Sequence, residues 1–235
     1  NYAVLEASKI KTHTGEINDG GLSFHGSTSA AWNTFPGTMG ASSGKWYWEV
    51  YAKQSSVIHT IGAGQDGSFH MWDTDVYPGQ SSYGNAFGLR ENGNLYVNGT
   101  ETTYYVDVWG ADDTSGFRNT IGIALDMDEG KAYISINGTW GSRWFTATSE
   151  QVSNGTAIPA ATGLTGIYRP LVAVKGGTYN WDTLDVNFGQ RPFRFPPPEG
   201  YKCWNRTNMP SPNRAGFNAS KYFKSMVWAG TGVNN

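Results

Sequence analysis

Acidic residues that stand close together are the first candidates for chemistry, because glycoside hydrolysis needs two carboxyl groups about 5–10 Å apart. On a strand such a pair would occupy positions i and i+2, which share a face. The close pairs are Asp73 with Asp75, Asp112 with Asp113, and Asp126 with Asp128. All of them stand in turn-like surroundings, and none forms an alternating acidic strand. We therefore expect a non-enzymatic protein without catalytic residues.

Metal ligands are the second chemical possibility. The four histidines, which are His13, His25, His59 and His70, are scattered and lack the spacing of a metal site. Cys203 is the only cysteine, which excludes an internal disulfide and a thiolate cluster within one chain. We expect no metal and no cofactor.

One acidic motif resembles the opening of a calcium loop. Residues 126–130 read DMDEG, and a full EF-hand loop would also need a bidentate Glu at its twelfth position. That position holds Asn137. Because Asp and Gly are also the usual residues of tight turns, the motif predicts a hairpin turn between two strands.

Aromatic residues gather in two turn-rich stretches, 67–84 and 104–109. Exposed aromatic rings on loops over a rigid scaffold are a common means of recognition. The alternative is that several of these rings cap the edge of the core. The predicted ligand-binding residues are Phe69, Trp72, Tyr77, Tyr104, Tyr105 and Trp109.

Short β-rich runs must position these loops. Bulky apolar and polar residues alternate in KWYWEVY at 45–51, which is the period-2 pattern of a half-buried strand. Further strands are predicted at 120–126, 131–137, 169–174 and 184–188, and the first two of these form a hairpin. Asn-Gly pairs at 92, 98, 137 and 154 mark turns, since both residues tolerate positive φ. The best helical candidate is the weakly periodic stretch 220–228.

Composition supports an all-β domain. The chain has 235 residues, of which 14% are aromatic and 15% charged, and 31 glycines punctuate it. The net charge of −2, without a run of Lys and Arg, argues against nucleic acid as a partner. No stretch of about 18 apolar residues exists, so we expect no membrane insertion.

The composition changes after Phe195. Residues 196–200 read PPPEG, and 205–218 are rich in Asn, Pro and Arg, which is typical of a linker. We predict a β-sandwich over 1–204 and a linker or extended arm over 205–235 that leads into a further segment. Because the first residue is Asn, we expect a fragment, a processed chain or a partly traced one.

Four blocks, in this order, resemble the SPRY domain family. They are SGKWYWEV at 43–50, IGIALDMD at 121–128 leading to Asn137-Gly138, RPLVAV at 169–174 and VNFGQRPF at 186–193. The resemblance covers about residues 1–204. It implies a concanavalin-like jelly roll of two antiparallel sheets, whose ligand is usually met by loops at one end.

Two flanking stretches are similar to SPRY proteins of tailed bacteriophages, namely PPPEGYK at 196–202 and NASKYF at 218–223. This second resemblance implies a virion structural or adhesion module in a tail fibre, appendage or surface decoration, localised to the virion. Its partners would be other virion proteins, or a host surface protein or glycan, and it would act as a homo-oligomer in an assembly. The alternatives are a cellular SPRY adaptor that binds a short peptide, and a glycan-binding lectin.

Overall fold

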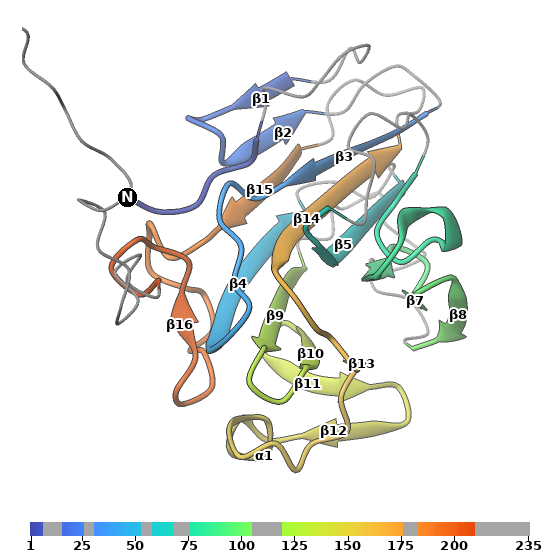
Figure 1. Cartoon of the computed structure of the whole chain (residues 1–235), viewed down its shortest axis with the longest axis vertical. Helices are drawn as coiled ribbons and strands as arrows, with labels where there is room; N and C mark the ends of the chain where they lie inside the picture. Colours follow the sequence, from blue (N-terminus) through green and yellow to red (C-terminus); the bar gives the residue numbers. More distant parts are fainter. Residues whose placement is uncertain are drawn as a thin grey trace, which may run out of the picture.

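The protein is an all-β sandwich with one short α-helix in the part of the chain that the computed structural model describes, which is residues 1–6, 16–25, 31–52, 58–67, 76–104, 119–175 and 183–209. Two sheets face each other and the core lies between them (Figure 1). Among these residues, all strand pairs are antiparallel except that of β4 with β16. The predicted fold class is confirmed.

Ten strands of the larger sheet lie in the described residues. Its main path runs β1 (Glu16–Asn18), β2 (Ser23–His25), β15 (Thr183–Asn187), β4 (Lys45–Ala52), β9 (Thr120–Asp126), β10 (Lys131–Ile136), β11 (Thr139–Ser142) and β12 (Phe145–Ala147). Two short strands lie off this path, β13 (Ala161–Thr162) beside β10 and β16 (Lys202–Cys203) beside β4.

The smaller sheet contains six strands within the described part of the chain. Their order is β3 (Trp32–Pro36), β14 (Tyr168–Lys175), β5 (Ile58–Gln65), β6 (Ala86–Arg90), β7 (Asn94–Val97) and β8 (Thr100–Thr103). A 3-10 turn, η1 (Ser81–Tyr83), precedes β6. The strand runs expected at 45–51, 120–126, 169–174 and 184–188 fall on β4, β9, β14 and β15.

The core is built from alternate residues of facing strands. Trp48 and Val50 of β4 point inward and are fully buried, and so are Ile121 and Ile123 of the neighbouring β9. Across the sandwich, Phe24 of β2 meets Phe35 of β3 with ring centroids 4.5 Å apart. The period-2 pattern therefore selects the inward face, as the burial of large apolar side chains requires.

The four Asn-Gly pairs lie in turns, but at 92–93 and 154–155 only the glycine has positive φ, with Gly93 at 83° and Gly155 at 76°. Both residues of the 98–99 and 137–138 pairs have positive φ, with Asn98 at 50° and Asn137 at 49°. These pairs join β7 to β8 and β10 to β11 as two-residue hairpin turns. Residues 126–130 form the turn between β9 and β10, as expected from their Asp and Gly content.

A five-residue helix, α1 (Ser149–Ser153), was not predicted. Thr148 caps it: the Thr148 side chain accepts from the backbone of Gln151, and the Gln151 side chain accepts from the backbone of Thr148. This capping box is visible in the sequence as T-x-x-Q and could have revealed the helix. The helical candidate at 220–228 lies outside the described residues.

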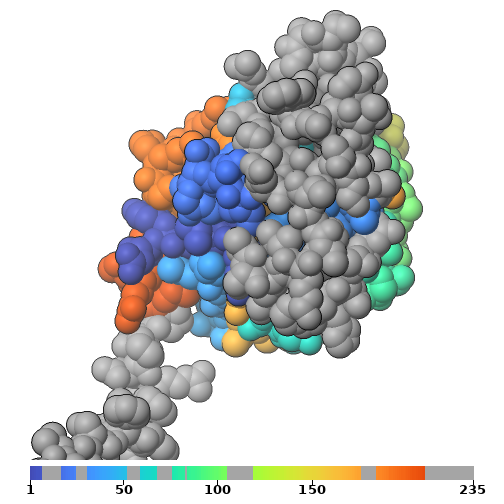
Figure 2. Space-filling model, turned by 90° about the horizontal axis from the view of Figure 1, so that it is seen from above, coloured from blue at the N-terminus to red at the C-terminus, as the bar shows by residue number. Residues whose placement is uncertain are grey.

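The C-terminal exit packs back onto the sandwich. Trp204 is fully buried against Trp46 and Trp48, with ring centroids 4.9 and 5.8 Å away. Residues 205–209 lie beside the N-terminus, where Arg206 N–H donates to the carbonyl of Asn1 (Figure 2). The proposed arm therefore starts with residues that contact the domain. Since 210–235 lie outside the described residues, the boundary at 204 stays a prediction.

Candidate binding site

An aromatic cluster with one arginine occupies the outer face of the smaller sheet. Trp32 of β3 and Tyr96 of β7 both contact Tyr77, with ring centroids 4.7 and 5.1 Å from that of Tyr77. The guanidinium carbon of Arg90, on β6, lies 5.5 Å from the ring of Trp32 and 5.7 Å from that of Tyr77. We call these four residues the aromatic–arginine cluster.

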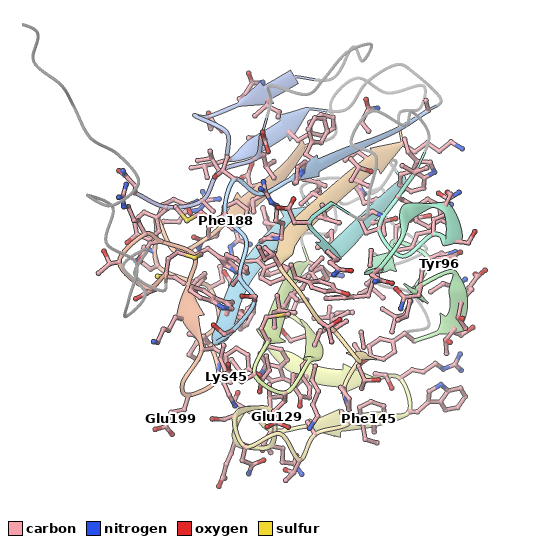
Figure 3. All side chains as sticks on the ribbon, in the orientation of Figure 1. Lys45, Tyr96, Glu129, Phe145, Phe188 and Glu199 are labelled. Carbon is pink, nitrogen blue, oxygen red and sulfur yellow. The ribbon has the colours of Figure 1, made fainter. Side chains whose placement is uncertain are left out.

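Strand alternation places three members of the cluster outward. Phe35, Leu89 and Leu95 on the same strands point into the core. Trp32, Arg90 and Tyr96 stand at the opposite parity and therefore face away from the core. Tyr96 lies on the opposite side of the molecule from Phe188 (Figure 3), so this surface is distant from the C-terminal exit.

Tyr77 reaches the cluster on a segment that lies across the sheet. The hydroxyl of Thr34 donates to the carbonyl of Val76 at 2.6 Å, and Pro78 is buried against the sheet. Gly88 makes the close approach possible, since a Cβ there would come within 2.5 Å of the Pro78 carbonyl oxygen. The segment 76–80 is thus anchored, and it directly follows the stretch that carries Phe69 and Trp72.

The charges of the cluster are partly balanced. Arg90 pairs with Glu91, with Nε and Oε1 3.2 Å apart, and both side chains stay about a fifth exposed. Burial, and then a hydrogen bond with Glu101, raises the pKa of Tyr96 to about 12. The Tyr96 hydroxyl therefore stays neutral at physiological pH. Trp32 and Tyr96 are only 5% and 7% exposed, so they mainly support the cluster from within. The surface offered to a partner comes from the half-buried Tyr77 and Arg90, a ring face and a guanidinium that suit a polar partner.

The predicted ligand-binding residues lie in different parts of the structure. Tyr77 is half-buried within the cluster. Tyr104 is only 7% exposed and belongs to the main core, where its ring meets Phe145 edge-on. Burial raises the pKa of Tyr104. Little of its ring can therefore reach a ligand, which agrees with the alternative that some of these rings cap the core edge. Phe69, Trp72, Tyr105 and Trp109 lie outside the described residues.

Trp32, Arg90 and Tyr96 were missed by the sequence reasoning. Each stands at an outward position of a strand. A large ring at such a position, as at Trp32 and Tyr96, indicates that another segment packs over that face of the sheet. These three residues come together because β3, β14, β5, β6 and β7 pair in that order, which brings residues as far apart in sequence as 32 and 96 onto one face. Only the sheet order reveals this proximity.

The acidic candidates show structural roles where they are described. Asp126 is fully buried, and its Oδ1 accepts from the backbone N–H groups of Asp128 and Glu129, both at 3.1 Å. Its Oδ2 lies 3.1 Å from Nζ of Lys45. The pair thus stabilises the β9–β10 turn. The other acidic pairs, at 73 and 75 and at 112 and 113, lie outside the described residues.

The stretch GASSG at 40–44 matches the G-x-S-x-G sequence motif of a nucleophile elbow. An elbow needs a strand that leads into a helix, whereas these residues lead into strand β4. Ser42 is therefore not placed as a nucleophile of that type. Within the described ranges, no group of three or more His, Cys, Asp or Glu residues could hold a metal ion.

No helix among the residues that the structure describes is both long and apolar enough to cross a membrane.

The two sheets and their order give this chain the fold of a SPRY domain, a concanavalin-like β-sandwich. A solved structure with this fold is the SPRY domain of human HERC1. The match has a TM-score of 0.54 at 15% sequence identity, and covers 80% of this chain and 99% of that one. No family model matches the chain, and no curated protein matches it. The SPRY-like fold expected from the four sequence blocks is confirmed.

Proposed function

We propose that this chain is a non-enzymatic recognition module, which binds a protein or glycan through the aromatic–arginine cluster and the loops around it. The observation that carries the proposal is the anchored position of Tyr77 beside Arg90, Trp32 and Tyr96. Trp, Tyr and Arg are the residues that most often dominate the energy of an interface.

The anchoring of 76–80 supports this proposal in a second way. A loop whose end is held against a rigid sheet loses less conformational entropy on binding than a free loop. Phe69 and Trp72 precede this anchor in the sequence by only a few residues, and the proposal includes them in the binding surface. The glycan-binding alternative uses the same surface, because aromatic faces and guanidinium donors also suit sugars.

The test is binding to peptide and glycan arrays by the full chain and by Trp72→Ala with Tyr77→Ala combined. We expect the double variant to lose at least tenfold in affinity for the ligand found. Trp144→Ala is the matched control, because Trp144 is 72% exposed on the β11–β12 turn. Arg90→Gln adds a variant that keeps both rings. Full binding by the folded double variant would overturn the proposal.

For the biological setting we propose a virion structural or adhesion module of a tailed bacteriophage, present on the surface as a homo-oligomer. The support is the resemblance of 196–202 and 218–223 to phage SPRY proteins, together with the linker-like composition after 204. Many copies in one particle would let weak contacts add through avidity. Mass spectrometry of purified virions tests this setting, and absence of the chain from the particles would exclude it.

A cellular SPRY adaptor that binds a short peptide is the second candidate. It is favoured by the fold shared with the human HERC1 SPRY domain. Neighbouring phage head or tail genes would exclude the adaptor, whereas a RING or coiled-coil module in the same gene would exclude the phage setting.

A further inference from the structure

A polar hollow lies on the outer face of the larger sheet, away from the aromatic–arginine cluster. Strands β4 and β15 run side by side there, with Tyr51 opposite Asp185 and Glu49 opposite Asn187. The segment after β15 contributes Arg191 and Arg194 to the wall of the hollow, which is open on one side and has a volume of about 150 Å³.

The walls of this hollow are held in place by the fold. Glu49 is buried, and its two carboxylate oxygens accept from the backbone N–H groups of Arg194 and Phe195, both at 2.9 Å. The side-chain amide of Asn187 donates to the carbonyl of Pro192 at 3.1 Å. Because these contacts clamp 192–195 against the sheet, the hollow exists before any ligand arrives, which lowers the entropic cost of binding.

The two arginines have far more donors than partners. The guanidinium carbon of Arg194 lies 3.5 Å from the centre of the Tyr51 ring, and one of its nitrogens donates to the Thr120 hydroxyl at 3.4 Å. Among the described residues Arg194 forms no ion pair. Arg191 is about half exposed, and its nearest carboxylate oxygen, on Asp185, is 4.0 Å away, which is a long ion pair. A guanidinium carries five N–H donors, so most of these remain for a ligand.

We propose that this hollow binds a carboxylate, and specifically the side chain of an acidic residue of a partner polypeptide. Planar guanidinium groups match carboxylates in a bidentate geometry, and stacking on Tyr51 fixes the plane of Arg194 in advance. Backbone N–H groups already occupy both oxygens of Glu49. The Asp185 carboxylate also lines the hollow, 4.0 Å from Arg191, so a bound carboxylate shares Arg191 with Asp185 and depends most on Arg194.

The size of the hollow selects a side chain over a sugar. Its volume of about 150 Å³ is about half that of the smallest pockets that usually bury a whole small-molecule ligand, which start at about 300 Å³. A single side chain that enters from a partner polypeptide fits such a hollow better than a whole sugar does. The hollow lies on the larger sheet and the aromatic–arginine cluster on the smaller one, so either can bind without the other.

The test is an NMR titration of the full chain with capped Gly-Glu-Gly, capped Gly-Gln-Gly and glucuronate. The signals followed are the Arg side-chain N–H groups and the backbone of 185–195. We expect saturable binding of the glutamate peptide in the millimolar range, and at least tenfold weaker binding of the glutamine peptide. Tighter binding of glucuronate than of the glutamate peptide would overturn the assignment to a polypeptide.

Arginine variants identify the site. Arg194→Gln and Arg191→Gln should each weaken binding of the glutamate peptide several-fold or more. Arg143→Gln is the matched control, because Arg143 also stacks on an aromatic ring, with its guanidinium carbon 4.2 Å from the centre of the Trp144 ring. Equal losses in all three variants, or no loss in the first two, would overturn the proposal. Arg191, being half exposed, tests the site even if Arg194→Gln proves unstable.

Discussion

The carboxylate of Glu49 and the backbone N–H of Arg194 are joined by a 2.9 Å hydrogen bond across 145 residues of sequence. Glu49 lies in the middle of β4, and Arg194 lies in the segment that leaves β15. The same carboxylate accepts from the backbone of Phe195 and from the hydroxyl of Tyr47, at 3.0 Å from the latter. One buried side chain thus attaches the C-terminal exit to the larger sheet.

Glu49→Gln should lower the free energy of unfolding by about 2–4 kcal/mol, because the new amide group would face a backbone N–H donor that then lacks an acceptor. Denaturant unfolding followed by tryptophan fluorescence measures the loss. Glu129→Gln is the matched control. Glu129 is 63% exposed and lies 3.8 Å from Lys131, so we expect its replacement to change stability by less than about 1 kcal/mol. Similar losses in both variants would contradict the proposed attachment.

His59 should make stability depend on pH. Burial lowers its pKa from 6.5 to about 3. Because the pKa in the folded state lies below that in the unfolded state, protons bind the unfolded chain first as the pH falls. The contribution of His59 is therefore complete above about pH 6.5 and is lost toward pH 3, at up to about 1.4 kcal/mol per pH unit.

His59→Gln removes this titration. The difference in unfolding free energy between the wild type and the variant should shrink as the pH is lowered from about 7 to 4. Urea unfolding at several pH values measures it, and a difference that stays constant over this range would show that His59 is not buried as a neutral group.

Trp204→Ala in the full chain should destabilise the fold by about 3–5 kcal/mol, because a large ring is removed from between Trp46 and Trp48. Trp144→Ala removes the same side chain from an exposed position and should cost less than about 0.5 kcal/mol. Thermal and denaturant unfolding of the two variants give the comparison. A small loss for Trp204→Ala would place the end of the domain before residue 204.

Gly88→Ala should lift the segment 76–80 from the smaller sheet, because its Cβ would meet the Pro78 carbonyl oxygen at 2.5 Å. We expect a loss of about 1–3 kcal/mol and faster proteolysis near Tyr77. Gly163→Ala is the comparison. No atom lies within 4 Å of a Cβ there, but φ is +71°, so the variant should lose stability without exposing 76–80. Unchanged proteolysis in Gly88→Ala would contradict the anchoring.

The strands could be predicted because the pattern that defines each of them lies within a few consecutive residues. In β4 and β9 the inward residues repeat at every second position, and a side chain at the wrong parity would leave the core. The hairpin turns at Asn98 and Asn137 follow from the tolerance of Asn-Gly for positive φ. The helix α1 was missed because five residues make little more than one turn, so an apolar periodicity cannot repeat, although its capping box was present.

The sequence by itself determined the all-β class, the hairpin turns and the position of the main strands along the chain, since each depends on a few neighbouring residues. The tertiary structure decided that Tyr104 belongs to the core while Tyr77 joins Trp32, Arg90 and Tyr96. It also decided that Arg194 stacks on Tyr51 and that Trp204 is buried. Burial and contact depend on which strands lie side by side, and that order is set by the packing of the whole chain.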